Sequence, residues 1–285
     1  EDWCKIKFAS SYSNPLNDAG SFYISNNTSQ FTQVIDLVIP GSVKEIGDYQ
    51  FNGLPGVKTV VIENGVTSIG KFAFFDSRAI TSISIAESVE EIKEGAFRWC
   101  DNITKINLPK NLSVLETNAI NISRLSSLTI PSSIKEIKDQ TALYGLKTVY
   151  YNGTFEEWKK IINAHFIFGS VTNFYYLNES NDYIKLTDLV IEEGVTTLDN
   201  RYIDGYLGLE KVYLPKSLKK VSSDFFYGCS NLVELYYDGV AENWDVKVLI
   251  NNDKNLEVIV YGEPTNYTDY THINWLINID MVKVF

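Results

Sequence analysis

The chain has 285 residues, of which 45% are hydrophobic and 21% are charged, a composition typical of a folded globular protein. Its 25 Lys and Arg residues against 36 Asp and Glu residues give a formal net charge of −11, which argues against nucleic acid or an anionic membrane as a partner, because both require a basic surface. No apolar run is long enough to cross a bilayer as a helix, and three Cys residues are too few for a disulfide-rich scaffold.

A repeat of about 23 residues runs through most of the chain. Its signature is an L-x-x-L-x-L spacing, for example Val57-x-x-Val60-x-Ile62. The last apolar position of the signature recurs in two series, Ile39, Ile62, Ile85, Leu108, Ile130 and Tyr151, and then Ile191, Leu214, Tyr237 and Tyr261. Such a period is typical of a solenoid, in which each coil is too thin to bury its apolar residues alone and stacks on its neighbours.

Each repeat also contains a second apolar pair, such as Val66 and Ile69, followed five positions later by a further apolar residue. These later residues are Phe51, Phe74, Phe97, Ile120, Ala142, Ile203 and Phe226. The last three positions of the L-x-x-L-x-L signature alternate inward, outward and inward, which predicts a short strand in every coil and a parallel sheet of stacked strands. A proline follows several of these strands and marks their ends, at Pro40, Pro109, Pro131 and Pro215.

Two stretches carry a family resemblance. Residues 38–47 read VIPGSVKEIG, and residues 94–103 read EGAFRWCDNI. They resemble the BspA-like leucine-rich repeat (LRR_5-type) of bacterial cell-surface proteins, and the resemblance covers nearly all of residues 19–261. It implies a right-handed leucine-rich-repeat solenoid, rich in β-structure, with a parallel sheet of about a dozen short strands and short 3-10 or α segments in the connections.

One motif interrupts the plain repeat. The segment 150–158, YYNGTFEEW, recurs as residues 236–244, YYDGVAENW. Thr154 and Glu157 have the spacing of a capping box, which predicts a short helix from Phe155 to about Ala164. We interpret Trp158 and Trp244 as residues that fill the core of a variant coil.

The repeats also predict the domain organisation. The first three residues, EDW, match the end of this variant motif, so we expect a fragment of a longer array. Short strands are expected at 22–24 and 174–176, each followed by a compressed connection to the next coil. We expect residues 1–285 to form one continuous solenoid, with 1–158 and 159–261 as imperfect repeated blocks and 262–285 as a C-terminal cap.

Residue types with catalytic or metal-binding chemistry are sparse. His165 and His272 have no companion Cys pair or second His at ligand spacing, and no nucleophile–base or phosphate-binding motif is found. We therefore expect no metal, no cofactor and no enzymatic activity. Cys100 and Cys229 occupy the same position in different coils, so we expect them to be buried and too far apart to form a disulfide. The segment 251–253, NND, is at most a weak cation site.

The position between the second and third apolar residues of the signature should point outward from the sheet. In chain order this outward row consists of Tyr23, Val38, Val61, Ser84, Asn107, Thr129, Tyr150, Tyr175, Val190, Tyr213, Tyr236 and Val260. We interpret Tyr150, Tyr175, Tyr213 and Tyr236 as a candidate ligand-binding set, because exposed tyrosines on a rigid scaffold give large contact area for little lost entropy. The alternative is cross-strand aromatic stacking that only stabilises the sheet.

The resemblance implies an extracellular location at a bacterial cell surface and attachment to host matrix proteins or to neighbouring cells. The leading hypothesis is therefore an extracellular binding or adhesion module that recognises a protein through its sheet face. The alternatives are a carbohydrate-binding module, in which the tyrosines stack on sugar rings, and a passive spacer for another domain. We expect a monomer without membrane insertion and without nucleic-acid binding.

Overall fold

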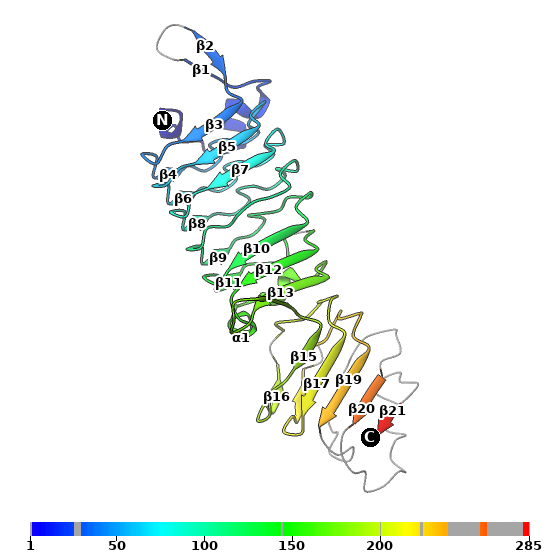
Figure 1. Ribbon diagram of the computed structural model, residues 1–285. Coiled ribbons are helices and arrows are strands. Elements are labelled where there is room, and N and C mark those ends of the chain that lie inside the picture. The colour runs from blue at the N-terminus through cyan, green and yellow to red at the C-terminus, as the bar shows by residue number, and fades with distance from the viewer. Residues whose placement is uncertain are drawn as a thin grey trace. The chain divides into compact units, whose positions relative to one another are not determined.

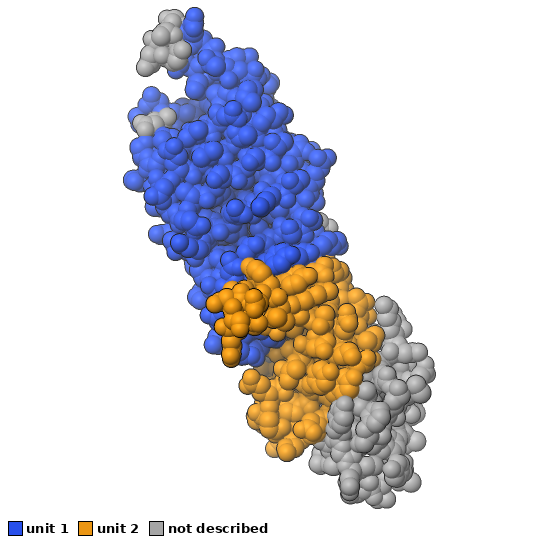
Figure 2. Space-filling model, viewed as in Figure 1, with its two compact units in different colours: residues 1–163 blue, residues 164–285 orange. Residues whose placement is uncertain are grey.

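The computed structural model describes residues 2–25, 30–143, 145–199, 201–222 and 225–238, together with the backbone of two strands at 257–260 and 282–284. The chain divides into two compact units, unit 1 over residues 1–163 and unit 2 over residues 164–285 (Figure 2). Each unit consists of stacked coils. The repeat-based blocks meet close to this division, and the continuity of a single solenoid across it stays a prediction.

Unit 1 contains two kinds of parallel strand, which lie along different sides of its coils (Figure 1). The longer strands form two sheets, one of β3 (Asp36–Ile39), β5 (Thr59–Ile62) and β7 (Ser82–Ile85), and one of β10 (Ser127–Pro131) and β12 (Thr148–Asn152). The short strands are β4 (Glu45–Ile46), β6 (Ser68–Ile69), β8 (Glu91–Ile92), β9 (Val114–Leu115) and β11 (Glu136–Ile137). The longer strands follow the L-x-x-L-x-L signature, and the short strands follow the second apolar pair.

The core between these sheets is built from the residues at one repeat position, the apolar residue five positions after the second apolar pair, in successive coils. Phe74 lies between Phe51 and Phe97, with ring centroids 5.3 and 5.4 Å away and nearly parallel ring planes. All seven apolar residues predicted at this position are buried, and the seven stretch across both units. Stacking equivalent apolar side chains from coil to coil supplies the core that no single coil could form.

Backbone hydrogen bonds also join the turns that carry these phenylalanines. The amide of Phe51 donates to Ala73 O, and the amide of Phe74 donates to Ala96 O, both at 2.8 Å. The N-terminal segment, with the 3-10 helices η1 (Asp2–Lys5), η2 (Ser11–Ser13) and η3 (Pro15–Asp18), is held to the first coil. Trp3 Nε1 donates to Gln50 O at 2.9 Å, and Gln50 Nε2 donates back to Trp3 O at 2.7 Å.

The two predicted short strands at 22–24 and 174–176 are each part of an antiparallel hairpin, and not of a compressed connection. Strand β1 (Tyr23–Ser25) pairs with β2 (Phe31–Gln33), and β13 (Asn173–Leu177) pairs with β14 (Tyr183–Lys185). Both hairpins close with the same bond near their base, from Val34 N to Phe22 O and from Leu186 N to Phe174 O. The repeat pattern could not reveal them, because the returning strands are mostly exposed and lack the periodic apolar residues.

The predicted helix from Phe155 to about Ala164 is much shorter. Helix α1 spans only Phe155–Trp158, although its capping box forms as expected, with Thr154 N donating to Glu157 Oε2 at 2.8 Å. The helix stops because Ile162 pairs with the edge of β11: Ile162 N donates to Lys135 O, and Ile137 N donates to Ile162 O. An extended residue at this point cannot continue a helix. Trp158 is fully buried, as predicted for a core residue, whereas Trp244 lies outside the described residues.

One predicted strand of unit 1 does not form. The apolar residues Ile103, Ile106 and Leu108 are buried, so their inward orientation is confirmed, but residues 103–109 are not in a strand. The two residues after this segment are hydrogen-bonded to Glu87 of the previous coil: the backbone amide of Lys110 donates to Glu87 Oε2 at 2.8 Å, and Asn111 Nδ2 donates to Glu87 O at 3.2 Å.

Unit 2 begins with the 3-10 helix η4 (Ala164–Ile167) and repeats this architecture. Its parallel sheet has the order β15 (Asp188–Val190), β17 (Lys211–Pro215), β19 (Glu234–Asp238), β20 (Glu257–Val260) and β21 (Val282–Val284), and a second sheet pairs β16 (Thr197–Leu198) with β18 (Lys220–Val221). The register places Ile259 opposite Tyr236, which corrects the predicted position of Val260 by one residue. Strand β21 lies in the segment 262–285, which the sequence analysis predicted as a C-terminal cap, and it pairs with β20.

Candidate binding surface

The outward face of the longer strands differs between the two units. In unit 1, Val38 on β3 lies opposite Val61 on β5, and both are substantially exposed, at 52% and 39%. Further along unit 1 the outward row continues with Ser84 on β7 and then with Thr129 opposite Tyr150 on β10 and β12. Small polar residues therefore occupy the middle of this row, between the exposed valines of β3 and β5 and Tyr150 of β12.

In unit 2 the corresponding face has large and charged side chains. Its three neighbouring strands contribute two outward residues each, in register: Asp188 and Val190 from β15, Lys211 and Tyr213 from β17, and Glu234 and Tyr236 from β19. Side chains two positions apart on a strand share one face, so these six residues form a continuous surface. Val190 is 65% exposed, whereas the residues on β17 and β19, namely Lys211, Tyr213, Glu234 and Tyr236, are half-buried.

Tyr213 and Tyr236 form the centre of this surface. Their ring centroids are 4.5 Å apart and their planes differ by 8°, so the two rings stack. The hydroxyl of Tyr236 donates a hydrogen bond to the Glu234 carboxylate, which raises the pKa of Tyr236 to about 12. Lys211 Nζ is 3.0 Å from Glu234 Oε2 on the neighbouring strand. A Lys–Glu–Tyr chain thus fixes the edge of the stacked pair.

Within unit 2, the structure brings together Tyr213 and Tyr236, two of the four predicted tyrosines. Tyr175 lies on β13, in the hairpin sheet of unit 2, where its partner across the strands is Lys185. Tyr150 belongs to unit 1, where it lies beside Thr129. All four tyrosines are half-buried. Lys211 and Glu234 are not among the predicted residues, although a second outward row, two residues before the tyrosines, could have revealed them.

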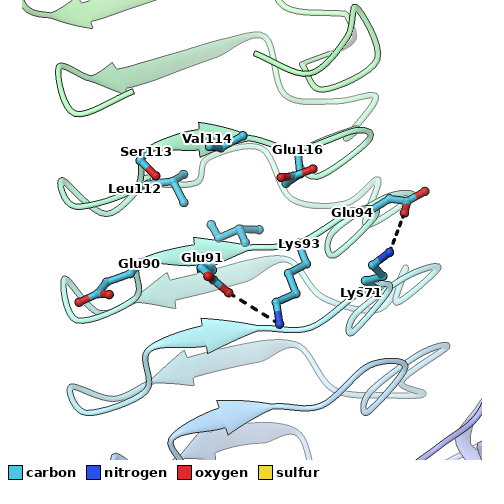
Figure 3. Close-up of a pocket in the computed structure, with 10 residues that line it drawn as sticks. Lys71, Glu90, Glu91, Lys93, Glu94, Leu112, Ser113, Val114 and Glu116 are labelled. Carbon is cyan, nitrogen blue, oxygen red and sulfur yellow. Dashed lines mark hydrogen bonds and ion pairs between the residues drawn. The ribbon is translucent and has the colours of Figure 1, made fainter. Parts of the chain in front are cut away.

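The short-strand side of unit 1 contains a hollow of about 400 Å³ (Figure 3). Charged side chains from consecutive coils line it, and they pair with one another: Lys93 Nζ is 3.7 Å from Glu91 Oε2, and Lys71 Nζ is 3.4 Å from Glu94 Oε2. The acidic pair Glu90 and Glu91 thus belongs to a charged surface.

Within the described residues, no group of three or more His, Cys, Asp and Glu side chains is arranged to hold a metal ion. Burial lowers the pKa of His165, and His272 and residues 251–253 lie outside the described part of the chain. The three Cys residues form no disulfide, and Cys100 and Cys229 are fully buried, as predicted. No helix among the described residues is long and apolar enough to cross a membrane.

The coil period, the stacked strands and the turn phenylalanines coincide with a known repeat family. A model of the BspA type leucine-rich repeat region matches six copies over residues 23–148 and 152–270. The chain belongs to the BspA-type leucine-rich-repeat family. The fold class expected from the sequence, a leucine-rich-repeat solenoid with parallel strands and short helical connections, is thereby confirmed. No curated protein matches the sequence.

Solved structures similar to this BspA-type chain include a leucine-rich cell surface protein from Faecalibacterium prausnitzii, with 17% identity, coverage of 92% of this chain and 86% of that one, and a TM-score of 0.37. A leucine-rich-repeat protein from Bacteroides ovatus has 15% identity, coverage of 85% and 83%, and a TM-score of 0.43. The pneumococcal vaccine antigen PcpA has 15% identity, coverage of 94% and 83%, and a TM-score of 0.39. At these identities the likeness concerns the repeat fold alone.

Proposed function

We propose that this BspA-type repeat chain is an extracellular binding or adhesion module of a bacterial cell surface, which recognises a host or neighbouring-cell protein through the outward face of its longer strands. Membership of a family named for a bacterial surface protein supports the location. The proposed contact residues are Tyr150, Tyr175, Tyr213 and Tyr236, with Lys211 and Glu234 beside the last two.

The observation that carries the proposal is the stacked pair Tyr213 and Tyr236 on an outward sheet face. Tyrosine is enriched among the residues that dominate binding energy at protein interfaces, because its ring offers a large contact area and its hydroxyl a hydrogen bond. Here the rings are already ordered by stacking and by the bond to Glu234, so a partner would not have to immobilise them on binding.

The test is binding of the 285-residue chain to an array of extracellular-matrix proteins and glycans, measured beside a Tyr213→Ser/Tyr236→Ser variant. We expect a protein on the array to bind the unmodified chain and to bind the variant at least about tenfold more weakly, since two central tyrosines typically contribute more than 1 kcal/mol each. A Tyr12→Ser/Tyr227→Ser variant is the matched control, because these tyrosines are 92% and 53% exposed and lie outside the sheet face.

The other outcomes separate the alternatives. Binding to a glycan that depends on Tyr213 and Tyr236 would assign a carbohydrate-binding module. Protein binding that both variants retain equally would remove the tyrosines from the site. A chain that binds nothing on the array would be assigned as a spacer for another domain.

A further inference from the structure

A second surface, on the turns of unit 1, combines aromatic rings with arginines. We call it the Trp99 patch, and its members are Tyr49, Phe72, Phe75, Arg78, Arg98 and Trp99. The four rings form a continuous chain across three successive coils. Tyr49 stacks on Phe72 with centroids 5.5 Å apart. Phe72 meets Phe75 edge-on at 5.7 Å, and Phe75 lies 4.9 Å from Trp99.

Arg98 lies over the end of this chain. Its guanidinium carbon is 4.6 Å from the centroid of the Trp99 ring and 5.8 Å from that of Phe75. No carboxylate among the described residues forms an ion pair with Arg98, and its Nε is buried without a hydrogen-bond partner there. The planar guanidinium of an arginine combines contact with aromatic rings and N–H groups in a fork that binds a carboxylate at two points.

The backbone under the patch takes a conformation that large side chains avoid. Tyr49, Phe72 and Trp99 have φ values of 56°, 53° and 65°. At the positions equivalent to Trp99, three other coils have Gly53, Gly205 and Gly228, with φ of 64°, 77° and 74°, and one has Asp76, with φ of 56°. Glycine adopts this left-handed conformation without strain, whereas an aromatic residue does so at an energetic cost. Large side chains held in a strained conformation at a surface point to a role other than supporting the turn.

The patch is also where the arginines of this acidic chain gather. The sequence has four Arg residues, and three of them, Arg78, Arg98 and Arg124, lie in these turns. Asn102 links the outer two: its Nδ2 donates to Arg78 O at 2.7 Å, and its Oδ1 accepts from Arg124 Nη1 at 2.8 Å. Arg78 is neutralised by Asp76, which leaves Arg98 as the cation with no carboxylate partner in the described part of the patch.

We propose that the Trp99 patch docks a protein partner that presents a carboxylate beside an aromatic or aliphatic side chain. The carboxylate would bind the guanidinium of Arg98, and the apolar side chain would pack on Trp99, which is 38% exposed. Trp, Tyr and Arg are the residue types enriched at the energetic centre of protein interfaces. The patch extends over three coils, which matches the broad contact of a protein better than the small footprint of a sugar.

The experiment is selection of a displayed random-peptide library on the 285-residue chain, followed by affinity measurement of the enriched peptides. We expect the enriched peptides to carry Asp or Glu next to an aromatic or aliphatic residue. Arg98→Gln and Trp99→Gly should each weaken their binding about tenfold or more, because the first loses a charge-assisted contact and the second loses an aromatic contact at the centre of the patch. Trp99→Gly should fold, since glycine occupies equivalent turns in other coils, and an unchanged melting temperature checks this.

A third variant tests the geometry of the Arg98 side chain. Arg98→Lys keeps the positive charge but loses the planar fork of the guanidinium, so it should weaken peptide binding as well.

Two controls keep this surface distinct from the tyrosines of unit 2. Lys105→Gln removes an exposed cation elsewhere in unit 1, and Tyr213→Ser/Tyr236→Ser removes the other proposed site; both should bind the selected peptides like the unmodified chain. Peptides without acidic residues, or equal binding by all variants, would overturn the proposal. Arg98-dependent binding of uronic-acid oligosaccharides in place of peptides would overturn the protein assignment and make the patch a glycan site.

Discussion

Tyr213 and Tyr236 are direct neighbours on β17 and β19, and their rings stack at a centroid distance of 4.5 Å. The geometry of this pair is therefore compatible with both hypotheses about the outward tyrosines, namely that they stabilise the sheet by stacking across strands and that they form a binding surface. Stability measurements separate the two roles, because stacking needs only the rings, whereas recognition also uses the exposed ring edges and the hydroxyls.

Tyr236→Phe keeps the stacked ring and removes the hydroxyl bond to Glu234. We expect it to change the free energy of unfolding by less than about 1 kcal/mol, because the lost bond is at the surface, while Tyr236→Ser should lose the stacking contribution of about 0.5–1.5 kcal/mol. Urea denaturation of both variants measures the difference. Tyr12→Ser is the control and should stay within about 0.5 kcal/mol of the unmodified chain. Equal effects of Phe and Ser at position 236 would contradict a stabilising role for the stack.

The hairpin β13–β14 is anchored by a buried tyrosine. Tyr206 Oη accepts from Phe174 N at 3.1 Å and donates to Leu186 O at 2.7 Å, at the base of the hairpin. Tyr206→Phe would remove both of these buried hydrogen bonds, so we expect it to lower the free energy of unfolding by about 2–4 kcal/mol. Tyr227→Phe, at an exposed position, should have no comparable effect.

Hydrogen exchange provides an independent readout for Tyr206. The amide of Phe174 should exchange faster in Tyr206→Phe, while amides of β17 and β19 should keep their protection. Unchanged exchange at Phe174 would show that the hairpin does not depend on this anchor.

The features that the sequence predicted correctly all depend on burial. A 23-residue period of apolar residues dictates which side chains face inward, so the core positions, the strand signature and the buried Trp158 could be read directly. The features that it missed depend on backbone pairing at a distance. Helix α1 ends early because Ile162 pairs with β11, and the hairpins arise where returning strands lack apolar periodicity. Neither the pairing of Ile162 with β11 nor the pairing of the hairpin strands can be predicted from the local pattern of apolar residues.

The candidate surfaces show the same division. The outward tyrosines were found because their position in the repeat is fixed, but which of them would touch depends on the sheets into which the strands assemble. The Trp99 patch was missed because its signal is a departure from the repeat, an aromatic residue in turns where other coils use glycine. Comparing turn positions between coils, in addition to apolar positions, would have revealed it.

The buried cysteines give a prediction about reactivity. Burial raises the pKa of the Cys229 thiol to about 12 and also raises that of the Cys100 thiol, and each sulfur donates a weak hydrogen bond to a backbone carbonyl of the preceding coil. Since the thiolate is the reactive form, Cys100 and Cys229 should not react with a thiol reagent in the native chain at pH 8. Only the half-buried Cys4 should be labelled, and all three thiols should react in urea. Native labelling of Cys100 would contradict the stacked core around Phe74.

The last prediction concerns acid and the carboxylate of Asp139. Burial opposes its ionisation, but four hydrogen bonds outweigh burial and lower its pKa: from the hydroxyls of Thr141 and Thr117, and from the backbone amides of Thr141 and Ala142. Thr117 belongs to the preceding coil, and its hydroxyl is 2.7 Å from Asp139 Oδ2. The charged form thus links two coils of unit 1.

A carboxyl group whose pKa is lower in the folded state than in the unfolded state stabilises the fold above its unfolded pKa of about 3.9 and loses this contribution as the pH falls through the folded value. Asp139→Asn should therefore be less stable than the unmodified chain at pH 7, with a difference that shrinks below pH 4 as the native Asp139 becomes protonated. Urea midpoints at pH 7, 4 and 2.5 measure this trend. A difference between Asp139→Asn and the unmodified chain that grew toward low pH would contradict the assigned direction of the pKa of Asp139.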